Sequence, residues 1–165
     1  MVVLARAITY ATFFVGFLLV FLPARVLEWS GVRRPAVIAL PQVAGVIVGL
    51  AGAALALACI VTFAFVGKGT PAPFDPPRRL VTAGPYRYLR NPMYVGAGFA
   101  LLGAALFYES PALLAYVAGF MLITHGFVLI YEEPALRRLF GSAYEAYCGE
   151  TGRWWPRRFR RSPPS

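Results

Sequence analysis

One stretch of the sequence gathers side chains suited to binding a polar or cationic molecule. Within residues 80–96, tyrosine, arginine and asparagine side chains stand beside Pro92, which suits the first turn of a helix. A helix N-terminus leaves backbone N–H groups free and favours a carboxylate. Tyr86 and Tyr94 could cover a purine or a sulfonium, since aromatic faces attract cations. We therefore expect this stretch to form one side of a ligand site.

Two adjacent carboxylates, Glu132 and Glu133, follow directly after an apolar run. Carboxylates at the end of a membrane span are costly unless they are solvated or paired. One interpretation is solvation at the interface, with Arg137 or Arg138 as partners. The other is that one carboxylate holds an ammonium group or ribose hydroxyls. The residue types alone leave both interpretations open.

The cysteines and the histidine do not suggest a metal site. The chain has two cysteines and one histidine. Cys59 lies in an apolar run and Cys148 in the polar C-terminal segment, so no group with zinc-ligand spacing is present. His125 lies within an apolar segment, where it could be a buried hydrogen-bonded residue or a substrate contact, and we expect it to face the interior of a helical bundle. We predict no metal ligands.

The composition indicates a membrane protein. Of the 165 residues, 59% are hydrophobic and 14% are charged, whereas soluble domains carry about 25% charged residues. The net charge of +9 could suggest nucleic-acid binding. However, the arginines flank apolar runs, where they set topology and contact lipid headgroups. We therefore expect contact with membrane lipids and no nucleic acid.

Four apolar segments could cross a bilayer. They must be helical, because unpaired backbone groups are too costly in hydrocarbon. They are roughly residues 4–27, 36–66, 93–108 and 112–131. The third is short, since a helical span needs about 20 residues. Because only residues 109–111 separate the last two segments, these should form an antiparallel hairpin, with Pro111 starting the fourth helix.

Small residues recur along the second segment, at Gly45, Gly49 and Gly52. Glycines at this spacing let helices approach closely. A dimer interface is one interpretation. Packing within a single chain is the more common use, and we expect it here.

The positions of lysine and arginine predict the orientation. Thirteen of the sixteen lie near the N-terminus, in the loop 67–91 or in the tail that begins at Glu132. Cytoplasmic segments carry the excess of positive charge. If all four helices cross, both termini and the polar site lie on the cytoplasmic face, where the loop and the tail can meet.

These patterns predict an all-α fold: a polytopic membrane helical bundle with about four transmembrane helices and a C-terminal interfacial amphipathic helix. The amphipathic helix is expected after Glu133, where apolar residues recur at helical spacing. A single integral membrane domain should cover 1–165. Its expected parts are N-terminal helices in 1–66, a core with loop, hairpin and C-terminal segment in 67–156, and a basic disordered tail in 157–165.

The motifs also resemble a known enzyme family. The matching positions are residues 84–96, Glu132, Glu133, Leu136, Phe140, Gly141, Tyr144 and Tyr147. They resemble the isoprenylcysteine carboxyl methyltransferases and the related phospholipid methyltransferases, integral membrane enzymes that use S-adenosylmethionine. The resemblance extends over residues 78–156. It implies an S-adenosylmethionine pocket enclosed by the hairpin and the C-terminal segment.

The resemblance also implies roles for individual residues. The cofactor-binding residues would be Arg78, Arg79, Leu80, Val81, Tyr86, Asn91, Pro92, Met93, Tyr94 and Glu132. Arg90 would lie beside the reacting groups as a catalytic residue. Glu133 is the candidate catalytic base for an amine acceptor. Two positions depart from the family: Asn91 stands where a histidine is common, and residues 127–130 lack an arginine found in the eukaryotic enzymes.

The expected function is S-adenosylmethionine-dependent methyl transfer to a carboxylate or an amine of a lipophilic acceptor, as in isoprenylcysteine carboxyl methyltransferases. A carboxylate needs no base, and Arg90 could orient it, whereas an amine must lose a proton. A phospholipid N-methyltransferase is the alternative, and a non-catalytic membrane assembly protein is a third interpretation. The scarcity of polar residues within the spans argues against transport.

Overall fold

The computed structural model describes residues 16–67 and 79–157, and the regular elements within these ranges are all helices. The all-α prediction is therefore confirmed for this part of the chain. Segments η1, η2 and η4 are π-helical and η3 is a 3₁₀ turn. The elements are η1 (Gly16–Phe21), α2 (Leu22–Ser30), α3 (Leu40–Thr62), η2 (Phe63–Gly67), η3 (Gly84–Arg87), α4 (Pro92–Phe107), α5 (Pro111–Phe127), η4 (Val128–Glu132), α6 (Glu133–Phe140) and α7 (Ser142–Glu150).

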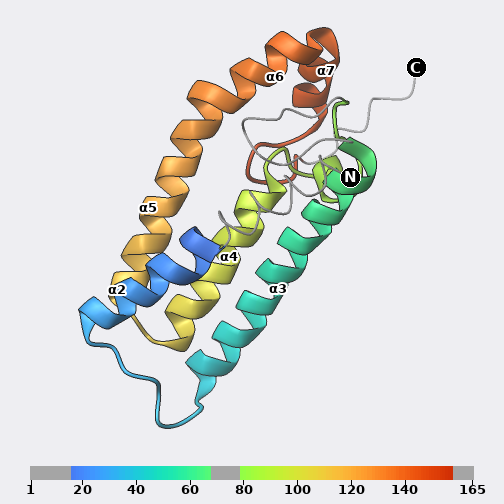
Figure 1. Ribbon diagram of the computed structural model, residues 1–165. Coiled ribbons are helices and arrows are strands. Elements are labelled where there is room, and N and C mark those ends of the chain that lie inside the picture. Colours follow the sequence, from blue (N-terminus) through green and yellow to red (C-terminus); the bar gives the residue numbers. More distant parts are fainter. Residues whose placement is uncertain (1–15, 68–78, 158–165) are drawn as a thin grey trace.

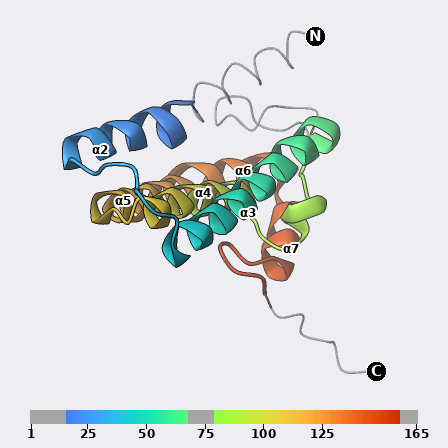
Figure 2. The same ribbon diagram turned by 90° about the horizontal axis from the view of Figure 1, so that it is seen from below.

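Helices α3, α4 and α5 form the centre of the bundle. Helix α4 lies between the other two and packs most closely against α3, while α2 crosses against α5 (Figures 1 and 2). The chain then returns at one end of the bundle, where α6 and α7 lie near the start of α4 (Figure 1).

Glycines bring α3 and α4 into backbone contact. A Cβ atom added at Gly45 would lie 2.6 Å from the carbonyl oxygen of Gly103, and one added at Gly96 would lie 2.8 Å from that of Gly52. No side chain fits at these positions without moving a backbone. The glycines of α3 therefore serve packing within the chain, as expected from their spacing.

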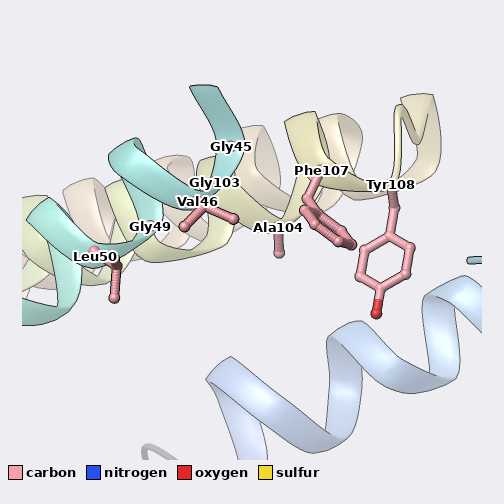
Figure 3. Close-up of a pocket in the computed structure, with 8 residues that line it drawn as sticks. All are labelled: Gly45, Val46, Gly49, Leu50, Gly103, Ala104, Phe107 and Tyr108. Atoms are coloured by element: carbon pink, nitrogen blue, oxygen red, sulfur yellow. The ribbon is translucent and has the colours of Figure 1, made fainter. Parts of the chain in front are cut away.

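A shallow apolar groove of about 280 Å³ lies along the contact between α3 and α4. Its lining includes Gly45 and Gly49 of α3, and Gly103, Phe107 and Tyr108 at the end of α4. Figure 3 shows Tyr108 pointing from the end of α4 toward α2. The groove lies at the C-terminal end of α4, away from the polar residues that the sequence singles out.

The predicted hairpin joins α4 and α5. Its turn places Glu109 at a φ of 47°, and the hydroxyl of Ser110 accepts a hydrogen bond from the backbone N–H of Leu113, which caps α5. The buried Gln42 side chain donates to the carbonyl oxygen of Phe107 at 3.1 Å and to the Glu109 carboxylate at 2.7 Å. These bonds attach the start of α3 to the hairpin.

Helix α5, segment η4 and helix α6 run as one continuous helix of 30 residues, Pro111–Phe140. This helix and the 23-residue α3 are the two described helices that are long and apolar enough to cross a membrane. Helix α4, with 16 residues, is shorter. The expected count of four spans is not confirmed, because half of the first predicted segment, residues 4–15, lies outside the described residues.

The C-terminal helix differs from the expected single surface helix. Helix α6 extends α5, and α7 follows after a turn at Gly141, whose φ is 51°. Pro134 does not interrupt the long helix, because it lies in the first turn of α6. The π-helical hydrogen bonding of η4 precedes it, and such a turn can absorb a local break in the α-helical pattern. The interfacial position of these helices stays a prediction.

Candidate functional site at the start of the helical hairpin

Four parts of the chain converge at one end of the bundle. They are the loop 79–91, the first turn of α4, the junction of η4 with α6, and residues 151–157 after α7. Figure 1 shows α7 and the segment that follows it beside the loop that leads into α4. The backbone N–H of Arg90 donates to the carbonyl oxygen of Gly152 at 2.8 Å, which ties the loop to the C-terminal segment.

Glu133 lies at the centre of this end and is 5% exposed. The Nε and Nη2 atoms of Arg153 donate to its two carboxylate oxygens at 2.7 and 2.9 Å. The Nη1 atom of Arg90 lies 3.2 Å from the same carboxylate. A buried carboxylate held by a two-pronged guanidinium has a fixed orientation. The cluster therefore holds Arg90 in a fixed position.

The Arg90 guanidinium includes a buried donor without a described partner. Its side chain is 12% exposed, and its Nη1 atom also donates to the Cys148 sulfur at 2.8 Å. Its Nε atom is buried and has no hydrogen-bond partner in the part of the chain that the structure describes. An unpaired buried donor costs about 1–3 kcal/mol. An acceptor atom supplied by a bound molecule would remove that cost.

Glu132 faces a different neighbour. Successive residues of a helix point about 100° apart, so Glu132 and Glu133 contact different parts of the site. The hydroxyl of Tyr94, on the first turns of α4, donates to the Glu132 carboxylate at 3.2 Å. A carboxylate offers about four lone-pair sites, so Glu132 can accept further bonds from an ammonium or from hydroxyls.

The N-terminus of α4 opens into the same region. Asn91 is the N-cap residue, but its side chain does not cap the helix. Instead its amide donates to the carbonyl oxygen of Arg153 at 3.4 Å. The amides of the first turn thus lack an internal side-chain cap, and such amides favour a carboxylate.

An apolar cluster fixes the loop on α3. Tyr86 is 7% exposed and packs with Cys59 and Val81, and its ring meets that of Phe63 edge-on at 5.4 Å. The Tyr147 hydroxyl donates to the Tyr86 carbonyl oxygen at 2.6 Å. Burial raises the pKa of the Tyr147 phenol well above its usual range, so this donor keeps its proton at neutral pH.

The predicted site residues fall into three groups. Arg90, Asn91, Pro92, Tyr94, Glu132 and Glu133 meet in the polar region, and Val81, Tyr86 and Met93 belong to the apolar cluster beside it. Arg79 is exposed and Leu80 is half-buried in the loop. Arg78 lies outside the described residues.

Two contributors to the site, Arg153 and Cys148, do not follow from the sequence patterns. Arg153 is one of the arginines of the tail, which indicate membrane topology, and no pattern in the sequence gives Cys148 a role. The signal for Arg153 is its place beside Trp154 and Trp155, which are unusual companions for a cation in a solvated tail. Neither residue could be paired with Glu133 or Arg90 without knowing that α7 turns back over the loop.

The fold and this cluster define a helical-bundle protein whose polar site lies at the start of a helical hairpin. The family model for phospholipid methyltransferase matches residues 40–143, more than half of the chain. The chain therefore belongs to this family of membrane methyltransferases, which confirms the recognition made from its motifs. Neither curated proteins nor solved structures gave a match. The two long apolar helices are consistent with a membrane protein.

Proposed function

We propose that the protein is an S-adenosylmethionine-dependent methyltransferase that modifies a carboxylate or an amine of a lipophilic acceptor. The observation that carries the proposal is the buried Nε atom of Arg90, which has no hydrogen-bond partner among the described residues and is held beside Glu133. It is a fixed, cationic donor next to the residues expected to hold the cofactor. Family membership supports methyl transfer as the reaction.

The residues present fit S-adenosylmethionine. Its carboxylate suits the uncapped amides at the start of α4, and its ammonium or ribose hydroxyls suit the accepting capacity of Glu132. Tyr94 positions Glu132 through its hydroxyl. When bound, the cofactor supplies an electrophilic methyl group. The task left to the protein is to align the acceptor and to exclude water.

Arg90 and Glu133 have different roles in aligning the acceptor. Arg90 orients an anionic group of the acceptor through its free donor. Glu133 positions Arg90, because its carboxylate is engaged by two guanidinium groups. To act as the base for an amine, Glu133 would have to leave these ion pairs, which is costly for a buried charge. The site therefore suits a carboxylate acceptor, which needs no base.

A phospholipid amine is the second candidate acceptor. The observation in its favour is the family match, whose description names phospholipids. Product chemistry separates the two candidates. A methyl ester releases methanol in alkali, whereas a methylated amine is stable.

Binding and transfer test the proposal together. Calorimetry on detergent-purified protein would measure S-adenosylmethionine and S-adenosylhomocysteine, and labelled methyl would be followed into a membrane lipid extract. We expect Glu132→Ala to weaken cofactor binding and Arg90→Ala to lower turnover with binding retained. Glu150→Ala, at an exposed position on α7, is the control.

Two outcomes count against the proposal. If Glu132→Ala and Arg90→Ala both keep full cofactor binding and turnover, the site assignment is wrong. If lipid-supplemented wild-type protein neither binds the cofactor nor transfers methyl, a non-catalytic membrane protein is the better description.

A further inference from the structure

Residues 151–154, here named the C-terminal strap, cross the loop that carries Arg90. Leu89 and Gly152 form a parallel β-bridge, and the Arg90 backbone N–H donates to the Gly152 carbonyl oxygen at 2.8 Å. The next residue of the strap, Arg153, binds the Glu133 carboxylate with its side chain. The strap thus contacts both the backbone of Arg90 and the carboxylate that pairs with Arg90.

The strap has a second attachment, which the candidate site does not include. The indole N–H of Trp154 donates to Nδ1 of His125 at 3.0 Å, and the two ring centres lie 5.9 Å apart. His125 and Glu133 are eight residues apart on the same long helix, which corresponds to about 12 Å along a helix axis. Arg153 and Trp154, which are consecutive in the strap, therefore bind the long helix at two positions along its axis.

The hydrogen bond from Trp154 determines which nitrogen of the neutral His125 ring carries the proton. An indole N–H can only donate. His125 must therefore present an unprotonated Nδ1, which places the proton of the neutral ring on Nε2. A protonated imidazole carries hydrogen on both nitrogens, and it would meet the indole N–H with a second donor.

We propose that His125 and Trp154 are positioning residues for the Arg90 site, because their hydrogen bond holds the C-terminal strap in register over the loop. Loss of the bond frees the strap at Trp154, so Gly152 no longer fixes the Arg90 backbone and Arg153 no longer holds Glu133 in one place. The expected effect on methyl transfer rests on the proposed function. The role of the hydrogen bond in holding the strap is tested by hydrogen exchange, which does not depend on that function.

Hydrogen exchange at the Arg90 amide reports the strap directly, because that N–H bonds to Gly152. Full-length protein in detergent would be followed by mass spectrometry, with exchange rates normalised to those of the unfolded chain. At pH 7.5, Trp154→Phe and His125→Leu should exchange about fivefold faster, as the loss of one hydrogen bond predicts. His125→Asn, which keeps an acceptor, should stay near wild type.

Equal exchange in His125→Asn and His125→Leu would mean that the imidazole ring matters and the hydrogen bond to Trp154 does not, which would overturn the proposal.

A control separates positioning from general stability. Tyr116→Phe removes a hydrogen bond of 2.8 Å to the Leu18 carbonyl oxygen, away from the strap. It should lower the melting temperature without changing exchange at Arg90. If Trp154→Phe behaves in the same way, the positioning role is wrong. If Trp154→Phe loosens the strap but wild-type protein transfers no methyl group, the proposed function fails and the strap proposal stands.

Discussion

Arg153, in the segment after α7, holds Glu133 at the start of α6 through two hydrogen bonds of 2.7 and 2.9 Å. This pairing differs from the one expected for a solvated carboxylate, whose partner would be Arg137 or Arg138. Arg137 instead lies 3.1 Å from Glu145 on α7. Glu133 is thus paired inside the protein with cations from two other segments, Arg90 and Arg153.

Replacing Arg153 should therefore destabilise the protein. Arg153→Ala leaves the buried Glu133 with one cation, and we expect a loss of about 1–3 kcal/mol in the free energy of unfolding. Arg153→Lys keeps the charge but loses the two-pronged geometry, so its loss should be smaller. Thermal unfolding in one detergent would measure both. Arg138→Ala, on the exposed face of α6, should be neutral; an equal loss there would contradict the assignment.

The stability of the protein should depend on the side-chain amide donor of Asn91. It is 6% exposed, and its amide donates to the Arg153 carbonyl oxygen at 3.4 Å. Asn91→Asp keeps the size but sets a carboxylate against that oxygen, so we expect a larger loss of stability than for Asn91→Ala. Thermal unfolding of the two variants would compare them. An aspartate as stable as wild type would mean that this contact is absent in solution.

Much of the helical order could be predicted from the sequence because it follows from local patterns. The apolar segments, the short turn with Pro111 and the proline at position 92 each encode a helix or its start. The proximity of residues 84–94 to Glu132 follows from the hairpin, since an antiparallel pair returns the chain to its starting side. The Tyr94–Glu132 hydrogen bond is a consequence of that return.

The remaining contacts depend on how the chain folds back after α6. The turn at Gly141 directs α7 over the loop, and this places Cys148 and Arg153 beside Arg90. No periodicity in the sequence encodes that direction. The continuity of α5 with α6 could not be predicted either. A proline such as Pro134 is typical of the first turn of a helix, and this pattern is the same whether or not another helix precedes it.

Contact between α3 and α4 should depend on the absence of side chains at the crossing. A Cβ atom at Gly103 would meet the backbone of Gly45 and Gly49, so Gly103→Ala should force the helices apart and cost about 1–3 kcal/mol. Gly119→Ala is the matched control, because nothing lies within 4 Å of its added Cβ. There alanine should be neutral or stabilising by about 0.5–1 kcal/mol. Equal melting temperatures for the two variants would refute the packing argument.

Tyr147 should make stability fall in alkaline solution. Burial raises the pKa of its phenol, so the folded state binds this proton more tightly than the unfolded state, whose tyrosines titrate near about pH 10. The free energy of unfolding then decreases as pH rises above about 10. Tyr147→Phe should cost about 1 kcal/mol at pH 8, because the hydrogen bond to the Tyr86 carbonyl oxygen is lost. It should also show a shallower decline between pH 8 and 10.5. Tyr88→Phe, at a 54% exposed position, is the control, and its free energy of unfolding should vary with pH as in the wild type. If the curve for Tyr147→Phe runs parallel to that of the wild type, this phenol is not the buried group that titrates.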